Sequence, residues 1–285
     1  MTTNETNTTT PGRTLPMRVL LLGLPRTNTT SLTSALRTLG YTPYTMRALL
    51  QNPSHIPIWH AAIESTRHAP GLPLPINDIL SPYDAVADLP GCIFATQLIS
   101  AYPDARVILT TRRYEAWEAS MQESIWVLLT WRLFEVCRIT GVSRVAPLVR
   151  LLYALFGAHN GNTYGGCETR RAYERHNERV RELVSRERLL EIDAEDEVGW
   201  SEICGFLGVE RPVGKEYPRV QEDTAMRAGL EQTWWSMVRY LALMVALPGL
   251  VLVVGALLYV YADELRAVRD ENVFKPLKTY LDGDW

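Results

Sequence analysis

The sequence is poor in cysteine. Its 285 residues include four, which lie far apart and form no Cys-x-x-Cys pair: Cys92, Cys137, Cys167 and Cys204. Structural zinc sites usually need closely spaced cysteines, and disulfide scaffolds need many of them. We therefore expect no structural zinc, and the cysteine usage fits a reducing intracellular compartment better than an oxidising one.

The sequence also lacks an excess of positive charge and an apolar segment near its start. Lys and Arg total 29 against 32 Asp and Glu, which gives a net charge of −3 and a pI near 6.0. A nucleic-acid-binding surface needs a positive balance, so we expect no nucleic-acid partner. Residues 1–16 are polar and rich in Thr. Without an apolar core, they are predicted to be a disordered tail and not a secretory signal.

One stretch carries no charge at all. The 22 residues Tyr240–Tyr261 contain no Asp, Glu, Lys or Arg, and a helix of that length roughly matches the ~30 Å hydrocarbon core of a bilayer. Tyrosines lie at both ends of the stretch, as in the aromatic belts of membrane proteins. We predict one transmembrane helix at 240–261, preceded by a juxtamembrane helix at 225–239 and followed by a short tail at 262–285. A buried core helix is the alternative.

Strand-like and helix-like patterns alternate upstream of this stretch. Short apolar runs typical of strands occur at Val19–Leu22, Asp84–Leu89, Arg106–Thr111 and Leu189–Asp193. Helical patterns lie between them, the last at Trp200–Leu207 before Gly208. This alternation is typical of a parallel sheet. The predicted fold class is therefore α/β, with a P-loop-type parallel sheet flanked by helices and a C-terminal transmembrane helix.

The first strand ends in a polar loop that leads into a helical pattern. Gly23–Thr30 reads GLPRTNTT and fits the phosphate-binding pattern G-x-x-x-x-G-K-[S/T] at its first Gly and at Thr30. Such a loop directs backbone N–H groups and the positive end of a helix dipole toward an anion. Asn28 replaces the second Gly, and Thr29 replaces the Lys that contacts the β- and γ-phosphates in ATPases and GTPases. The loop is therefore predicted to bind an anion without hydrolysing a nucleoside triphosphate.

A second anion site is predicted near the loop. Arg112 follows the strand Arg106–Thr111, and Ser120 lies eight positions later, two turns along the next helical pattern. This spacing allows an arginine and a serine hydroxyl to converge on one phosphate. Together with Arg26 in the loop, they suit a ligand with phosphates at two separate places, neutralised without a metal ion.

Several stretches between Met17 and Asp223 are together more specific than the loop alone. They are GLPRTNTTSL (23–32), NPSHIPIW (52–59), YDAVADLPGCIF (83–94), AYPDARVILTTR (101–112), the Trp117/Ser120 pair, FLGVERP (206–212) and YPRV (217–220). The combination resembles the PAPS-dependent sulfotransferase superfamily, closest to its sulfotransferase-like branch abundant in fungi. The resemblance implies a P-loop α/β domain over residues 17–224 with PAPS (3′-phosphoadenosine 5′-phosphosulfate) as co-substrate and no metal.

The resemblance also implies a role for each candidate residue. Arg26 stands where the superfamily has a Lys that neutralises the leaving bridging oxygen, and Asp88 stands where many members have a His base. Both are therefore candidate catalytic residues. The phosphosulfate would be bound by the loop, through Gly23, Arg26, Thr27, Asn28, Thr29 and Thr30, and the 3′-phosphate by Arg112 and Ser120. Asn28 replaces a Gly, which suits the position if its φ is positive.

The predicted function is that of a membrane-anchored enzyme. It would transfer a sulfuryl group from PAPS to a hydroxyl of a lipophilic small molecule in secondary metabolism, with the catalytic domain on the cytosolic side. Two alternatives stay open: a tailoring cyclase, isomerase or dehydratase-like enzyme on the same scaffold without PAPS, and a non-catalytic membrane-bound binding protein. The sequence specifies neither the acceptor nor the oligomeric state.

Two further features concern the surroundings of the site. Residues 114–156 are helical in pattern and rich in apolar side chains, which predicts either two amphipathic core helices or a lid or membrane-contacting face around an apolar acceptor. Trp117, within this segment, is expected to serve packing. His159 and His176 have no partner pattern and are predicted to lie at the surface.

Overall fold

The computed structural model describes residues 13–68, 76–141, 146–220, 222–281 and 283. Most of the predicted tail at 1–16 lies outside these residues. The chain divides into two compact units, Met1–Ala228 and Gly229–Trp285. The five segment limits expected from the sequence, including the domain at 17–224, stay predictions.

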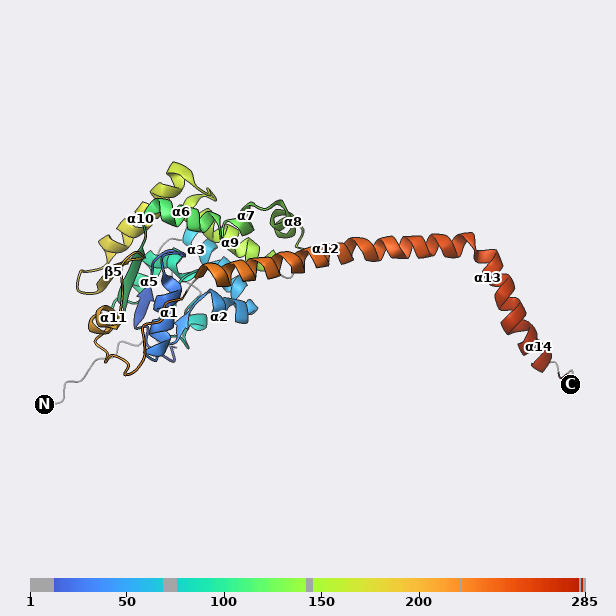
Figure 1. Ribbon diagram of the computed structural model, residues 1–285, viewed down its shortest axis with the longest axis horizontal. Helices are drawn as coiled ribbons and strands as arrows, with labels where there is room; N and C mark the ends of the chain where they lie inside the picture. The colour runs from blue at the N-terminus through green and yellow to red at the C-terminus, as the bar shows by residue number, and fades with distance from the viewer. Residues whose placement is uncertain (1–12, 69–75, 142–145, 221, 282, 284–285) are drawn as a thin grey trace. The chain divides into compact units, whose positions relative to one another are not determined.

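The first unit is built on a five-stranded parallel sheet (Figure 1). Its strands lie in the order β2-β3-β1-β4-β5. They are β1 (Val19–Leu21), β2 (Pro43–Tyr44), β3 (Ala85–Ala87), β4 (Arg106–Thr111) and β5 (Leu189–Asp193). Because β1 is the central strand, the loop that follows it lies at the middle of the carboxyl edge of the sheet. The predicted α/β fold class is confirmed.

Helices connect the strands and cover the sheet. In the first unit they are α1 (Thr29–Thr38), α2 (Met46–Gln51), α3 (Ile56–His68), α4 (Asn77–Leu80), α5 (Ala95–Ala101), α6 (Tyr114–Gln122), α7 (Val127–Thr130), α8 (Arg132–Thr140), α9 (Ala146–Asn160), α10 (Gly166–Leu183) and α11 (Trp200–Leu207), with the 3₁₀ segments η1 (Pro53–His55) and η2 (Gly91–Phe94). The remaining elements are α12 (Glu222–Val260), α13 (Ala262–Arg269), the π-helical η3 (Asp270–Phe274) and α14 (Lys275–Leu281).

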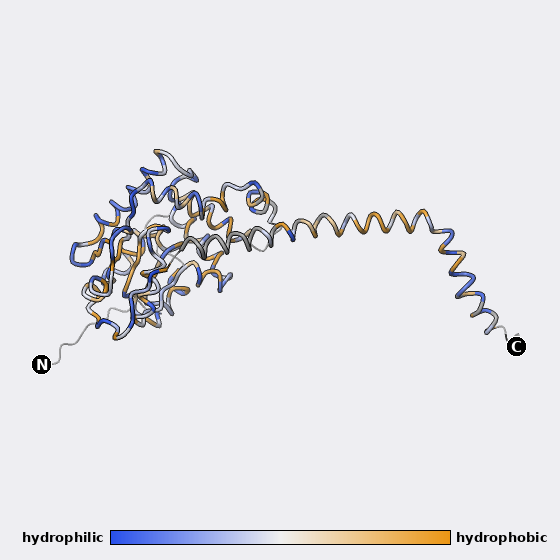
Figure 2. The backbone as a smooth tube through the Cα atoms, viewed as in Figure 1, coloured by the Kyte–Doolittle hydropathy of each residue, from blue (hydrophilic) through white to orange (hydrophobic). Residues whose placement is uncertain are grey.

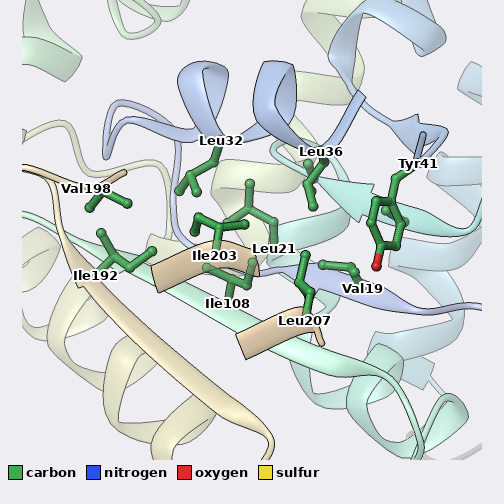
Figure 3. Packing of buried hydrophobic residues seen from close by; sticks show 12 residues of the cluster. Val19, Leu21, Leu32, Leu36, Tyr41, Ile108, Ile192, Val198, Ile203 and Leu207 are labelled. Carbon is green, nitrogen blue, oxygen red and sulfur yellow. The ribbon is translucent and has the colours of Figure 1, made fainter. Parts of the chain in front are cut away.

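One hydrophobic core fills the space between α1, α11 and one face of the sheet. Alternate strand residues contribute to it because successive side chains of a strand point to opposite faces. Figure 3 shows Val19 and Leu21 of β1 beneath Leu32 and Leu36 of α1. The remaining labelled members are Tyr41, Ile108, Ile192, Val198, Ile203 and Leu207. This packing fixes the position of α1, and therefore of the loop that leads into it.

Two parts of the first unit differ from the sequence-based expectation. The strand β2 was not predicted, because two residues are too short for a period-2 pattern. The segment 114–156 was expected to form two helices and forms four, α6 to α9. Of its apolar residues, Trp117, Trp126, Leu152 and Phe156 are buried, as a core role requires, whereas Val136 and Ile139 of α8 are 49% and 65% exposed.

The second unit contains the predicted apolar helix. Val238–Val260, within α12, has a mean hydropathy of 2.7 and none of its most apolar stretch is buried. Figure 2 shows an almost uninterrupted hydrophobic colour along this part of α12, which ends where α13 begins. By length and composition the helix can cross a membrane, and it overlaps the predicted span at 240–261.

Candidate functional site

The loop between β1 and α1 approaches the neighbouring strand closely at its first residue. A Cβ atom on Gly23 would lie 1.7 Å from the Thr110 hydroxyl oxygen and 2.7 Å from the Thr110 carbonyl oxygen. Any larger residue would therefore push the loop away from β4. The glycine predicted as the start of the anion-binding loop is required here by close packing.

The backbone of the loop turns through two left-handed residues. Arg26 has φ 72° and Asn28 has φ 66°, although neither is a glycine. Asn28 is the N-cap of α1 with ψ 24°, and its side chain makes no cap hydrogen bond. Left-handed residues that interrupt right-handed backbone form concave nests of N–H groups, which bind anions, and α1 adds the positive end of its dipole. The positive φ expected at Asn28 is present.

The three threonines of the loop differ in their surroundings. The Thr27 hydroxyl donates to the Leu24 carbonyl oxygen at 2.6 Å and lies 2.6 Å from the Thr110 hydroxyl. These contacts hold the hydroxyl of Thr27 inside the protein, so the expectation that it contacts the ligand is not supported and only its backbone N–H is left for that role. Thr29 is buried at the start of α1, whereas Thr30 is exposed.

Arg26, Arg112 and Ser120 come together in space. The Arg26 Nε donates to the Ser120 Oγ at 2.8 Å, and the Arg112 Nη1 donates to the Arg26 carbonyl oxygen at 3.3 Å. The Arg26 side chain is largely buried, since the residue is 7% exposed. The loop after β1 is therefore linked both to α6, through Ser120, and to the turn after β4, through Arg112; that these residues bind an anion stays a prediction.

Two aromatic side chains fix this site to the rest of the domain. Tyr173 of α10 accepts a hydrogen bond from the Arg112 N–H at 2.9 Å and donates its hydroxyl proton to the Arg112 carbonyl oxygen at 2.6 Å. Trp117 of α6 is fully buried, and its Nε1 donates to the Pro25 carbonyl oxygen at 2.9 Å. The rings of Trp117 and Tyr173 are in contact, with centroids 4.5 Å apart. Trp117 thus serves packing and also holds the loop.

Asp88 lies at the same edge of the sheet. It follows β3, which pairs with β1 through Leu21 and Ala87, so its backbone is next to the start of the loop. Asp88 has φ 63°, and its carbonyl oxygen accepts from the Cys92 N–H at 3.0 Å. Burial, together with the nearby Asp88 carboxyl group, holds the pKa of the Cys92 thiol well above its usual range. The backbone of Asp88 therefore lies at the edge of the sheet where the anion-binding loop begins, and its carboxyl group is close to the Cys92 thiol.

Two histidines that were predicted to lie at the surface are instead half-buried and in contact with other residues. The His176 Nε2–H donates to the Leu22 carbonyl oxygen at 2.8 Å, one residue before Gly23. The His159 ring lies edge-on to the His176 ring, with centroids 5.8 Å apart. Burial, aided by His176 and Arg175, lowers the pKa of His159 to about 3, and burial lowers the pKa of His176 as well. The surface prediction was wrong for both.

The positions of His159 and His176 along their helices are the sequence signal that the surface prediction overlooked. His159 continues the apolar series Leu152, Leu155 and Phe156 of α9 at positions i, i+3, i+4 and i+7, and His176 lies within the series Tyr173, Asn177 and Val180 of α10. Residues spaced in this way share one face of a helix. Periodicity alone would therefore have placed both histidines on the packed faces of their helices.

Two hollows adjoin these residues. One of about 430 Å³ is lined by charged side chains of α10 together with Thr111, Arg112 and Tyr173. The other, of about 490 Å³, includes His159 and His176 in its wall. Among the described residues, no group of three or more His, Cys, Asp or Glu is arranged to hold a metal ion.

The central loop, the parallel sheet and the helix N-terminus that the loop leads into define a P-loop-type α/β protein. Residues 18–226 match the sulfotransferase domain family. The chain is also 34% identical over 233 residues to the Ava biosynthesis cluster protein M of Aspergillus versicolor, and this match covers 78% of the chain and 88% of that protein. The chain therefore belongs to the sulfotransferase domain family and is sulfotransferase-like.

Proposed function

We propose that the protein is a membrane-anchored sulfotransferase that moves a sulfuryl group from PAPS to a hydroxyl of a lipophilic small molecule. The observation that carries the proposal is the convergence of Arg26, Arg112 and Ser120, with the Arg26 Nε 2.8 Å from the Ser120 Oγ. This convergence brings the guanidinium groups of Arg26 and Arg112 and the hydroxyl of Ser120 to the region where the loop after β1 meets the turn after β4. Membership of the sulfotransferase domain family supports the same ligand.

The residues of the site fit a ligand with two separate anionic groups. The nest at Arg26 and Asn28, with the N-terminus of α1, would hold the 5′-phosphosulfate through backbone N–H groups and the hydroxyls of Thr29 and Thr30. Gly23 would allow the loop to stay close to β4. Arg112 and Ser120 would hold the 3′-phosphate, since arginine suits phosphate through paired N–H groups.

The reaction would be a direct displacement at sulfur. The acceptor oxygen forms a bond to sulfur while the bond from sulfur to the bridging phosphate oxygen breaks, and the bisphosphate leaves with that electron pair. The Arg26 guanidinium would neutralise the charge that develops on the bridging oxygen. The acceptor proton would pass to the Asp88 carboxylate, which lies at the same sheet edge.

Two observations support a lipophilic biosynthetic product as the acceptor. The relative from Aspergillus versicolor is named as a protein of a biosynthesis cluster, which supports a role in secondary metabolism. The helix Val238–Val260 is long and apolar enough to cross a bilayer, and an enzyme anchored there would meet substrates that partition into lipid. We place the catalytic domain on the cytosolic side of that membrane.

A second candidate function has its own supporting observation. The Thr27 hydroxyl is bonded to the Leu24 carbonyl oxygen and lies against the Thr110 hydroxyl. One hydroxyl expected to contact the ligand is therefore already bonded within the protein. This arrangement favours the same scaffold working without PAPS, as a tailoring cyclase, isomerase or dehydratase-like enzyme, or as a non-catalytic binding protein.

A transfer assay with the full chain separates the two. The chain in lipid nanodiscs is incubated with PAPS and a lipophilic extract of the source organism, and mass spectrometry follows the bisphosphate and any acceptor that gains a sulfo group. We expect transfer that falls roughly 10²–10⁴-fold in Asp88→Asn, the usual contribution of a general base. Arg186→Ala, which removes a guanidinium far along the sequence from the proposed site, should leave the rate unchanged.

Two other outcomes would favour the second candidate, a scaffold that works without PAPS. A folded chain that leaves PAPS intact, together with an altered metabolite profile in a deletion strain, would support PAPS-independent tailoring. An unaltered profile would support the non-catalytic binding protein.

A further inference from the structure

The hollow of about 490 Å³ has apolar side chains along part of its wall. It lies among α3, η2, α5, α9 and α10, all in the first unit. Ile63, Ile93 and Phe94 line it. Ile63 and Phe94 are nearly buried, at 2% exposure each, so Ile93, which is partly exposed, offers the larger contact surface. Its volume is within the usual range of pockets for small molecules, about 300–1,000 Å³. The wall is therefore suited to the hydrocarbon or aromatic body of a small ligand.

Positive charge borders the same hollow. Arg67 of α3 and Arg175 and Arg179 of α10 line it, and its described lining contains no Asp or Glu. Arg67 and Arg179 make only loose ion pairs on the exposed side, at 3.6 Å to Glu64 and 3.4 Å to Glu182. Guanidinium groups with spare N–H donors bind carboxylates well. The charge of the lining therefore selects for an anionic group.

A buried polar atom lies in the wall between these parts. The His159 Nε2 is shielded from solvent and makes no hydrogen bond to the described residues. The neighbouring His176 already has a hydrogen-bond partner, because its Nε2–H donates to the Leu22 carbonyl oxygen at 2.8 Å. A buried nitrogen without a partner carries a desolvation cost. A ligand atom that hydrogen bonds to His159 would remove that cost.

We propose that this hollow binds a lipophilic molecule that carries one carboxylate. The carboxylate lies at His159 and the guanidinium groups of Arg67, Arg175 and Arg179, and the apolar body lies against Ile63, Ile93 and Phe94. An uncharged lipid would leave the His159 nitrogen and three arginines without a matched group. A small inorganic anion would leave the apolar wall uncovered.

Calorimetry with a matched pair of probes tests the site. The full chain in phosphatidylcholine nanodiscs is titrated with 2-naphthoate and with its neutral relative 2-naphthalenemethanol, with empty nanodiscs as the blank. We expect naphthoate to bind at least about tenfold more tightly, because hydrogen bonds to charged groups contribute about that factor. Equal affinity for the two probes would overturn the proposal.

Variants locate the binding within the chain. Arg175→Ala and His159→Phe should each weaken naphthoate binding about tenfold, and Arg175 is on an exposed helix face, so its loss should leave the fold intact. Arg171→Ala on the same helix removes a guanidinium that does not line this hollow and should change nothing. Wild-type affinity in Arg175→Ala would contradict the proposal, whatever His159→Phe does.

A third probe identifies the source of the carboxylate. If 6-hydroxy-2-naphthoate binds and is sulfated in the presence of PAPS, with a KM that rises in Arg175→Ala, the carboxylate belongs to the acceptor itself. If it binds in the same Arg175-dependent way without being sulfated, the hollow holds a separate ligand. Either result supports the site, and because binding is measured apart from transfer, failure of the proposed function would not be mistaken for failure of the site.

Discussion

Asn28 occupies a backbone conformation that few side chains tolerate. Its φ of 66° lies in the left-handed region, which Asn reaches more easily than other residues with a Cβ. Its side chain does not cap α1, so its contribution to the loop is its backbone conformation and not a cap hydrogen bond. The N–H groups of the loop can then turn toward an anion although the second glycine of the motif is absent.

Substitutions at Asn28 should follow backbone preference. Asn28→Gly is expected to keep the free energy of unfolding within about 0.5 kcal/mol, because Gly adopts positive φ without strain. Asn28→Val is expected to lower it by about 1–2 kcal/mol, since a β-branched residue is strained there. Urea denaturation of the two variants measures the difference, and equal stabilities would contradict the left-handed assignment.

His159 should make the domain sensitive to acid. Burial lowers its pKa from 6.5 to about 3 in the folded chain, so between those values the unfolded chain binds the additional proton. Stability that is fully present above pH 6.5 is therefore lost as the pH falls, by up to about 1.4 kcal/mol per pH unit. The lowered pKa of His176 acts in the same direction.

The variant His159→Phe removes this titration. Urea unfolding at pH 7, 6 and 5 should show a shallower loss of stability in the variant than in the wild-type chain. Parallel curves would mean that His159 is exposed to water in solution, as the sequence alone suggested.

At the scale of elements, the site depends on contacts between segments that are distant in sequence. α10 reaches the end of β4 through Tyr173, whose hydroxyl serves both the N–H and the carbonyl oxygen of Arg112. α6 reaches the loop through Trp117 and the Pro25 carbonyl oxygen. Both contacts hold backbone groups of the loop or of the turn after β4, so they position the site without themselves having to touch a ligand.

Loss of the Tyr173 hydroxyl should therefore have two effects. Tyr173→Phe leaves a buried N–H and a carbonyl oxygen of Arg112 without their partner, which is expected to cost about 1–3 kcal/mol of folding free energy. It should also weaken binding of 3′-phosphoadenosine 5′-phosphate, because Arg112 is no longer held. Tyr83→Phe is the matched control, since Tyr83 packs edge-on against Tyr44, away from Arg112. Wild-type stability and affinity in Tyr173→Phe would contradict the positioning role.

Elements with a strong local pattern could be predicted from the sequence. The strands β4 and β5 have the predicted bounds, and α11 ends before Gly208, whose φ is 66°. Where the pattern is short or shared between several helices, prediction failed. β2 has two residues, and the apolar pattern of the segment continues across the boundaries between α6, α7 and α8.

The site residues could be predicted only where their spacing within one short segment of the sequence is informative. Gly23, Asn28 and the Arg112/Ser120 pair follow from local sequence, and the structure brings the last two to Arg26. The internal bonding of Thr27 depends on Thr110 of another strand, and the hollow at His159 depends on α3, α5, α9 and α10 together. A single sequence carries no direct record of such contacts.

At the scale of the whole molecule, the chain combines an α/β unit with a unit that contains an apolar helix. The first unit, Met1–Ala228, has its own hydrophobic core, and Val238–Val260 is exposed along its apolar length. Exposure of so many apolar side chains to water is unfavourable, at roughly 25 cal/mol for each Å². A lipid environment for this helix removes that cost.

Membrane association should therefore be lost with the second unit. The full chain, expressed in cells, should stay with the membrane pellet after alkaline carbonate extraction, whereas a chain that ends at Ala228 should appear in the supernatant. Protease protection of tags at each end would report the orientation. Release of the full chain by carbonate would contradict a membrane-spanning α12.

The central claim is that the loop after β1 and the turn after β4 bind one ligand with two separate anionic groups. Calorimetric titration of the full chain with 3′-phosphoadenosine 5′-phosphate tests it most directly. We predict saturable binding that Arg112→Ala weakens at least about tenfold, as expected for loss of a charged hydrogen bond, while Arg186→Ala binds as the wild type does. No heat of binding with the folded wild-type chain, or the same affinity in Arg112→Ala, would contradict the account.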